Sequence, residues 1–210
     1  MQLTNEWFFW TSEIDKKTCN KIKALGKDNF KSAEVDTKKE ISDEERKTGR
    51  KKEPGKDKKA RISDVSWTNE QWVIDLIWPY MMGANERAGW DFDITGVESM
   101  QITKYKPKGF YGWHKDGGSD CLSVYNNPDN KFLHGNGRKL SMTILLNGNY
   151  QGGEFQFAHY NKLKNKVETP DFKNAGSIIV FPSFMEHQVT PVTKGTRYSL
   201  VAWFVGPPFK

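Results

Sequence analysis

The chain has 210 residues, and a domain of this length buries about 70% of the surface that its unfolded chain exposes, enough for one core without disulfides. It has only two cysteines, Cys19 and Cys121, which excludes a disulfide framework and a cysteine-rich metal site. No apolar stretch approaches the length that spans a bilayer, and the aromatic cluster at residues 7–10 is too short for a secretion signal. We therefore expect a cytoplasmic protein without a membrane partner.

The net charge of +6 is concentrated in one segment. Residues 38–61 contain eleven basic and six acidic residues, a surplus of five, so the rest of the chain is nearly neutral and a nucleic acid is not the expected partner. Residues 31–66 contain no aromatic residue and can bury little apolar surface, which predicts a mobile basic loop. Such a loop could lie over the mouth of a site or be a solvated insertion.

Two helices are predicted on either side of this loop. Before it, apolar residues at helical spacing follow Ser12, which we expect to cap the first helix. After it, Thr68 and Gln71 form a second candidate capping pair, and Pro79 is expected to kink or end the second helix. We expect residues 1–95 to form a helical support for the rest of the domain.

From residue 97 onward the pattern changes to short apolar and β-branched runs separated by Gly, Pro and Asn. This rhythm is typical of a jelly roll, in which two sheets face each other. We predict a mainly β fold with N-terminal helices, a single domain over residues 1–210, and a jelly-roll (double-stranded β-helix) core over residues 96–206. The expected strands are residues 97–105, 111–114, 140–146, 154–157, 177–181 and 198–204.

Three residues of the strand region are candidate metal ligands. His114 and Asp116 are two positions apart, so on a strand both side chains would point to the same side and could face one metal ion. His187 lies near the end of another apolar run. Two histidines and one carboxylate leave open positions on an octahedral Fe(II) for an organic cosubstrate and dioxygen. A structural zinc site would need a fourth ligand, and no His or Cys has suitable spacing.

Arg197 follows His187 by ten positions, and the β-rich runs around the turn between them suggest that the two residues meet across a hairpin. Taken alone, His187 could also be a structural histidine at a strand end, and Arg197 could be a surface arginine. The two other histidines, His134 and His159, are expected to be exposed and without a catalytic role.

Several motifs occur in a specific order, at residues 96–105, 109–116, 138–147, 152–155 and 187–203. On these motifs, residues 61–204 resemble the Fe(II) and 2-oxoglutarate-dependent oxygenase superfamily, in particular its prolyl 4-hydroxylase-like branch. One departure is Arg197, which stands where many peptidyl-prolyl hydroxylases carry lysine and is closer to a bacterial hydroxylase subgroup.

The resemblance implies roles for the cosubstrate residues. Fe(II) would be held by the two histidines and the aspartate, and Arg197 would pair with the distal carboxylate of 2-oxoglutarate. Tyr105 would hydrogen-bond the cosubstrate, and Ser199 would add a hydroxyl, although both could also be ordinary strand residues. Dioxygen and 2-oxoglutarate would be consumed, with ascorbate as a candidate reductant.

The resemblance also implies a substrate pocket. Tyr111, Arg138 and Trp203 match positions that line this pocket in prolyl hydroxylases, with strand packing and a surface ion pair as the alternatives. The implied substrate is a proline in a peptide or protein, and a free amino acid or another acceptor is the alternative with the same chemistry. The DNA-repair branch has a further arginine where this chain has Trp203. A non-catalytic jelly-roll binding module is the alternative of another class.

Overall fold

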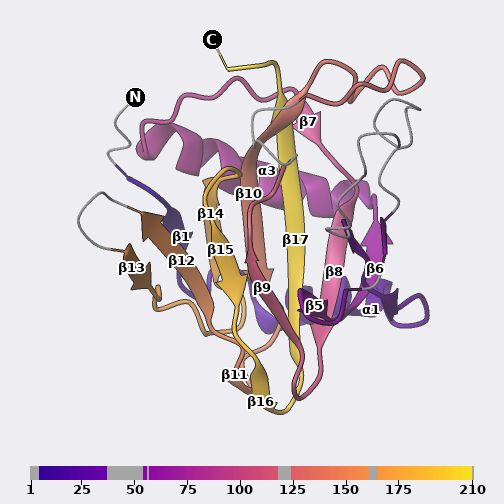
Figure 1. Ribbon diagram of the computed structural model, residues 1–210, viewed down its shortest axis with the longest axis vertical. Helices are drawn as coiled ribbons and strands as arrows, with labels where there is room; N and C mark the ends of the chain where they lie inside the picture. The colour runs from indigo at the N-terminus through magenta and orange to yellow at the C-terminus, as the bar shows by residue number, and fades with distance from the viewer. Residues whose placement is uncertain (1–4, 37–53, 56, 118–123, 161–164, 210) are drawn as a thin grey trace, which may run out of the picture.

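The computed structural model describes residues 5–36, 54–55, 57–117, 124–160 and 165–209. This part of the chain is mostly β-strand, with the two helices α1 (Lys16–Leu25) and α3 (Gln71–Arg87). Neither helix is both long and apolar enough to cross a membrane. In Figure 1, α3 lies behind the larger of two sheets, and the smaller sheet lies in front of it.

The larger sheet has eight strands, and its longest strand, β17, lies between β10 and β8 near the centre. Neighbouring strands in it are antiparallel. In spatial order the strands are β1 (Phe8–Trp10), β14 (Ile178–Pro182), β10 (Gly137–Leu145), β17 (Arg197–Gly206), β8 (Met100–Tyr105), β6 (Asp64–Thr68) and β2 (Lys31–Ser32), with β7 (Gly96–Val97) paired to β17.

The smaller sheet has five strands, and two short strand pairs complete the β-structure. Its spatial order is β13 (Asn165–Glu168), β12 (Phe155–Tyr160), β15 (His187–Val189), β9 (Phe110–His114) and β5 (Arg61–Ile62). The separate pairs are β11 (Gln151–Gly152) with β16 (Val192–Lys194), and β3 (Val35–Asp36) with β4 (Pro54–Gly55).

Alternation along the strands of the larger sheet creates two cores. In β14, Ile178 and Val180 pack in the cluster that includes the helices, whereas Ile179 and Phe181 pack with residues of the smaller sheet. Successive side chains of a strand point to opposite faces, so one apolar run serves both cores. The larger sheet is therefore covered on both faces, by the helices on one side and by the smaller sheet on the other.

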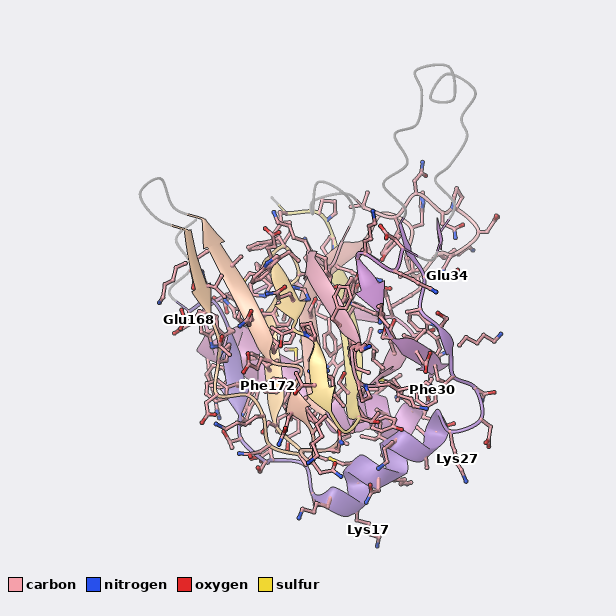
Figure 2. The ribbon with its side chains drawn as sticks, turned by 60° about the horizontal axis from the view of Figure 1, so that its bottom comes forward. Lys17, Lys27, Phe30, Glu34, Glu168 and Phe172 are labelled. Carbon is pink, nitrogen blue, oxygen red and sulfur yellow. The ribbon has the colours of Figure 1, made fainter. Side chains whose placement is uncertain are left out.

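Helix α1 is present as predicted, but Ser12 does not cap it. Asp15 is the capping residue, because its Oδ1 accepts hydrogen bonds from the backbone nitrogens of Lys17 (2.8 Å) and Thr18 (3.0 Å). Ser12 has a φ of 54°, and its backbone nitrogen donates to Ser177 Oγ. Lys17 points away from the body of the protein in Figure 2, so the polar face of the helix is in solvent.

Helix α3 is also present, but the predicted capping pair is wrong, and the helix does not end at Pro79. Its capping residue is Glu70, which makes no side-chain cap bond, and Thr68 Oγ1 only accepts from the backbone nitrogen of Glu70. The helix runs through Pro79 to Arg87. An interior proline costs about 3 kcal/mol. The large apolar side chains that α3 buries against the sheet, each contributing about 1.5–3 kcal/mol, outweigh this cost; they are Val73, Ile77 and Met81.

The predicted loop at residues 31–66 is wrong at both ends. Strands β2 and β6 pair with each other, and β6 also pairs with β8, so these residues extend the larger sheet. Strand β5 joins the smaller sheet. Residues 37–53, the middle of the predicted loop, lie outside the described residues. The N-terminal part of the chain therefore supplies strands to both sheets as well as helices.

The six predicted strands are all present with shifted ends. The first is interrupted, because β7 and β8 are separated by residues 98–99. Strand β10 begins earlier, at Gly137, and β12 continues beyond the predicted end to Tyr160. Several strands of two or three residues, such as β1, β5 and β15, were not predicted, because so few residues carry no clear alternation.

Candidate metal centre

The two candidate histidine ligands lie on adjacent strands of the smaller sheet. His114 ends β9, His187 begins β15, and the two residues face each other in the antiparallel register. Asp116 is not on the strand, contrary to the simple alternation that the sequence suggested. It lies in a bend after β9, where its backbone nitrogen donates to the carbonyl oxygen of Ser183 (3.0 Å). The register and this bend together bring the three side chains to one place.

The donor atoms of these side chains form a compact group. Asp116 Oδ1 lies 3.8 Å from His114 Nε2, and Oδ2 lies 3.5 Å from His187 Nε2. All three residues offer ligand atoms within 4.8 Å of one another. This spacing allows one ion to contact all three, and a set of two imidazoles and one carboxylate suits non-haem Fe(II).

Backbone carbonyls orient both imidazole rings. His114 Nδ1 lies 2.8 Å from the carbonyl oxygen of Gly112, and His187 Nδ1 lies 2.9 Å from that of Met185. Because a carbonyl oxygen only accepts, each Nδ1 donates and each Nε2 keeps its lone pair toward the aspartate. Both rings therefore present the tautomer that a metal ion requires.

Burial also favours the protonation states of metal ligands. Burial and the neighbouring His187 lower the pKa of His114 to about 3, so its imidazole is neutral at pH 7. Burial raises the pKa of Asp116, but the adjacent His187 and His114 outweigh this effect and leave the pKa below its usual value. The carboxyl group is therefore ionised and can bind a cation.

Arg197 lies on β17 in the larger sheet, paired with Tyr105 of β8. The prediction that Arg197 meets His187 across a hairpin is wrong. The two residues line one cavity but belong to different sheets. The Arg197 side chain is fully buried, with 1% of the residue exposed, and its Nη1 donates to Ser199 Oγ (3.0 Å). Its Nε and Nη2 have no hydrogen-bond partner among the described residues.

This arrangement leaves a buried cation with two unused donors. A buried guanidinium without an anion is costly, whereas a carboxylate can accept two parallel hydrogen bonds from it. The residues present therefore fit the distal carboxylate of a cosubstrate, and Ser199 acts by holding Nη1 of Arg197. Tyr105 is buried and lines the same cavity, with its ring centre 5.4 Å from Arg197 Cζ.

Gly153 provides the space that Arg197 occupies, a role that the sequence analysis did not assign. Its φ is +64°, and a Cβ atom there would lie 3.0 Å from Arg197 Cδ and 2.9 Å from Val192 Cγ2. A side chain at this position would therefore displace the arginine as well as strain the backbone. The signal in the sequence was the pair of adjacent glycines before β12.

Two of the three predicted substrate residues line the cavity. Tyr111 stacks on His114 with ring centres 3.4 Å apart, and burial raises the pKa of Tyr111 to about 12, so its phenol stays protonated. Trp203 has a buried Nε1 without a hydrogen-bond partner in the described part of the chain. Both aromatic side chains therefore line the same cavity as the three candidate metal ligands.

Arg138, the third predicted substrate residue, is engaged elsewhere. Its Nε and Nη2 donate to the two carboxylate oxygens of Glu98 at 2.8 Å and 2.7 Å. Tyr125 donates to the same carboxylate. The guanidinium also lies over the Trp203 ring, 4.2 Å from its centre. Direct contact of Arg138 with a substrate stays a prediction. In the described contacts, Arg138 is held by Glu98 and packs on the Trp203 ring.

Sequence reasoning missed other residues around the cavity. Gln101 and Thr143 are polar side chains that line the cavity from otherwise apolar strands. A polar residue at a buried position of an apolar strand is a signal that the sequence could have provided. Phe155 stacks on His187 with ring centres 5.4 Å apart. Arg61 also lines the cavity, but it lay within the predicted loop.

The remaining histidines have the expected position in only one case. His134 is exposed, as predicted. His159 is half-buried, which contradicts the prediction, because its Nδ1 lies 3.1 Å from Glu6 Oε2 and its ring packs beside Trp7. Neither histidine lines the cavity.

Comparisons with known proteins agree with this geometry. Residues 100–205 match the profile of the 2OG-Fe(II) oxygenase superfamily. A PKHD-type hydroxylase of Synechococcus sp. (strain CC9902) is 35% identical over 112 residues, which are 52% of this chain and 42% of that protein. A PKHD-type hydroxylase of Alteromonas mediterranea is 34% identical over 105 residues, 49% of this chain and 41% of the relative. The chain thus matches less than half the length of these curated relatives.

Solved structures share the fold at low identity. A Pseudomonas putida prolyl-4-hydroxylase has a TM-score of 0.62 and 16% identity, covering 96% of this chain and 92% of that one. A Trichoplax adhaerens prolyl hydroxylase, in complex with a peptide fragment of the hypoxia inducible factor oxygen degradation domain, has a TM-score of 0.65 and 16% identity. It covers 96% of this chain and 84% of that one. At these identities the likeness shows the fold.

Proposed function

Because the chain belongs to the 2OG-Fe(II) oxygenase superfamily, we propose that it is an Fe(II)- and 2-oxoglutarate-dependent dioxygenase that hydroxylates proline in a peptide or protein. One oxygen atom of O2 would enter a C–H bond of the substrate to form C–OH. The other would enter succinate as 2-oxoglutarate loses CO2. A free amino acid is the alternative acceptor with the same chemistry.

One observation carries the proposal: buried Arg197, with two nitrogens that have no partner among the described residues, lines the same cavity as a His-Asp-His cluster. A metal site alone would not need a buried cation nearby, and a buried arginine alone would not need a metal site. A small molecule with a carboxylate at each end, one held by the metal and one by Arg197, uses both.

The chain's own residues would hold and enclose the reactants. His114, Asp116 and His187 would bind Fe(II), which supplies coordination positions for 2-oxoglutarate and dioxygen. Arg197 would orient the cosubstrate through its distal carboxylate. The aromatic side chains around the ligands, such as Phe155, would exclude water from the site. Ascorbate stays a proposed reductant.

The proline assignment rests on the aromatic side chains of the cavity. Tyr111 and Trp203 both line the cavity, and their aromatic rings would pack against a pyrrolidine ring. The names of the relatives, PKHD-type hydroxylase and prolyl hydroxylase, support the same substrate type. We also propose that the two facing sheets form the jelly-roll core of one domain, with the catalytic cavity between them.

The direct test is calorimetric titration of 2-oxoglutarate, without oxygen, into protein loaded with Fe(II) or Mn(II). Succinate release is then measured in air, with and without proline-rich peptides. We expect metal-dependent binding and succinate release that the peptides stimulate. Binding without stimulation by peptides would move the proposal to free amino acids. Absence of metal-dependent binding would favour a non-catalytic binding module instead.

A further inference from the structure

One short connection holds two of the candidate metal ligands. Residues 183–186 connect β14 to β15 and begin with a turn. The carbonyl oxygen of Ser183 accepts a hydrogen bond from the backbone nitrogen of Asp116 (3.0 Å). Two residues later, the carbonyl oxygen of Met185 lies 2.9 Å from His187 Nδ1. The position of this turn therefore sets where the carboxylate and one imidazole meet.

Ser183 also ties this turn to β10 in the larger sheet. Its Oγ lies 2.9 Å from Ser141 Oγ, and its backbone nitrogen donates to the carbonyl oxygen of Lys139 (2.9 Å). Ser183 and Ser141 are only 1% and 0% exposed, so an unpaired hydroxyl group on either would be costly. Two adjacent hydroxyl groups share one hydrogen bond, and the remaining O–H needs another acceptor.

Asp116 supplies that acceptor. Although burial raises the pKa of Asp116, a hydrogen bond from Ser141 is among the contacts that lower this pKa below its usual value. An ionised carboxylate only accepts, so the Ser141 hydroxyl donates to Asp116 and the Ser183 hydroxyl donates to Ser141. Each hydrogen bond in such a chain polarises the next, and the bond to the charged acceptor is the stronger kind. The pair of hydroxyl groups therefore ends at the anionic residue of the His-Asp-His cluster.

We propose that Ser141 and Ser183 are positioning residues, whose two hydroxyl groups fix the Asp116 carboxylate before a cation arrives. This inference rests on the metal centre of the proposed function. Asp116 needs such support because it lies in a bend after β9, outside the paired strands that hold His114 and His187. A ligand that is fixed beforehand loses little conformational freedom on binding. The two serines would thus raise the affinity for the cation without touching it.

The test measures Mn(II) affinity by calorimetric titration without cosubstrate. Ser141→Ala and Ser183→Ala each remove one hydroxyl group, the double variant removes both, and Ser141→Thr keeps a hydroxyl group on the strand. Ser177→Ala is the matched control, because Ser177 is equally buried (1% exposed) and its Oγ accepts from the backbone nitrogen of Ser12 (3.0 Å). Ser177 precedes β14, whereas Ser183 follows it. Urea denaturation of the metal-free proteins measures the cost to folding.

We expect Ser141→Ala to bind Mn(II) about 10- to 100-fold more weakly than wild type, the range for residues that orient a metal ligand. Ser183→Ala should lose about two- to tenfold, the range for one neutral hydrogen bond. The double variant should bind no more weakly than Ser141→Ala, because the Ser183 hydroxyl acts through Ser141. Ser141→Thr should recover most of the affinity, and Ser177→Ala should bind Mn(II) like wild type even where urea shows a loss of stability.

Wild-type Mn(II) affinity in Ser141→Ala would overturn the inference. A loss in Ser177→Ala or Ser141→Thr as large as in Ser141→Ala would do the same, because the hydroxyl group would then not be the cause. If Ser141→Ala does not fold, Ser183→Ala decides: weaker Mn(II) binding supports the inference, and unchanged binding overturns it. Wild-type protein that binds Mn(II) but not 2-oxoglutarate would reject the proposed dioxygenase, and the variants would still decide on the two serines. Wild-type protein that binds no Mn(II) would reject both.

Discussion

The two faces of strand β17 are built differently. On the helix side, Leu200, Ala202 and Phe204 are buried among apolar side chains of the same cluster. On the cavity side, Arg197 and Trp203 are also buried, but both have nitrogen atoms without a partner in the described residues. Apolar packing among the described residues completes the helix side, whereas the cavity side keeps donors that a bound molecule would satisfy. One strand thus carries both a structural and a functional half, assigned by alternation.

The largest effect is expected on the cavity side, from a variant that removes a metal ligand. Asp116→Ala should abolish succinate release and metal-dependent 2-oxoglutarate binding, because the remaining histidines lose the one anionic ligand between them. Metal binding is measured by Mn(II) titration and turnover by succinate release. His159→Ala is the control, since this half-buried histidine lies outside the cavity, and it should keep turnover. Normal turnover in Asp116→Ala would contradict the metal assignment.

On the helix side, the expected effect is on stability. Phe204 is fully buried against the helices, so Phe204→Ala should lower the free energy of unfolding by about 3–5 kcal/mol. Val167 is 54% exposed on an outer strand, and Val167→Ala should change this free energy by less than about 0.5 kcal/mol. Urea denaturation measures both variants. A stability loss as small in Phe204→Ala as in the control would mean that the helix side is not closely packed.

The cavity side should respond to the loss of a buried residue in the opposite way. Arg197→Met should weaken 2-oxoglutarate binding by about 2–5 kcal/mol, because the distal carboxylate loses its charged partner. The free energy of unfolding should stay the same or rise, because the variant no longer buries an unpaired charge. Calorimetry measures the first quantity and urea denaturation the second. Arg197→Lys keeps the charge and should retain part of the affinity. A large stability loss in Arg197→Met, with normal cosubstrate affinity, would make Arg197 a structural residue.

This contrast also explains what the sequence could predict. The sequence predicted His114, Asp116 and His187 as one cluster from their chemistry together with the motifs around them, and the structure brings the three side chains together. The position of Arg197 relative to His187 was wrong, because a hairpin is the nearest arrangement in sequence and the actual one depends on how two sheets face each other. Such packing leaves no local signal.

The N-terminal part was harder to predict for a related reason. Strands β2, β5 and β6 pair with other strands of the two sheets, and such pairing leaves no local signal. Their own alternation of apolar and polar residues is weak, so the many charged residues nearby led to the prediction of a loop. Arg61 therefore fell within a predicted loop although it lines the cavity. Likewise, α3 passes through Pro79 because tertiary packing outweighs a local penalty, which composition alone does not reveal.

The smallest expected effect tests how closely the cavity side is fitted. Gly153 and Gly135 both have positive φ, at 64° and 78°, but a Cβ atom at Gly153 would press on Arg197, whereas nothing lies within 4 Å of one at Gly135. Both alanine variants should lose about 1–2 kcal/mol of unfolding free energy from backbone strain. Gly153→Ala should in addition weaken 2-oxoglutarate binding, because the guanidinium must move.

Gly135→Ala is therefore the matched control, since it carries the backbone strain without the contact. Calorimetric titration of 2-oxoglutarate into both metal-loaded variants separates the two effects. Equal affinities in the two variants would show that Arg197 moves aside without loss, and the cavity side would then be adaptable. A weaker affinity in Gly153→Ala alone would show that the chain fixes the guanidinium in place before the cosubstrate arrives, so that little ordering of Arg197 opposes binding.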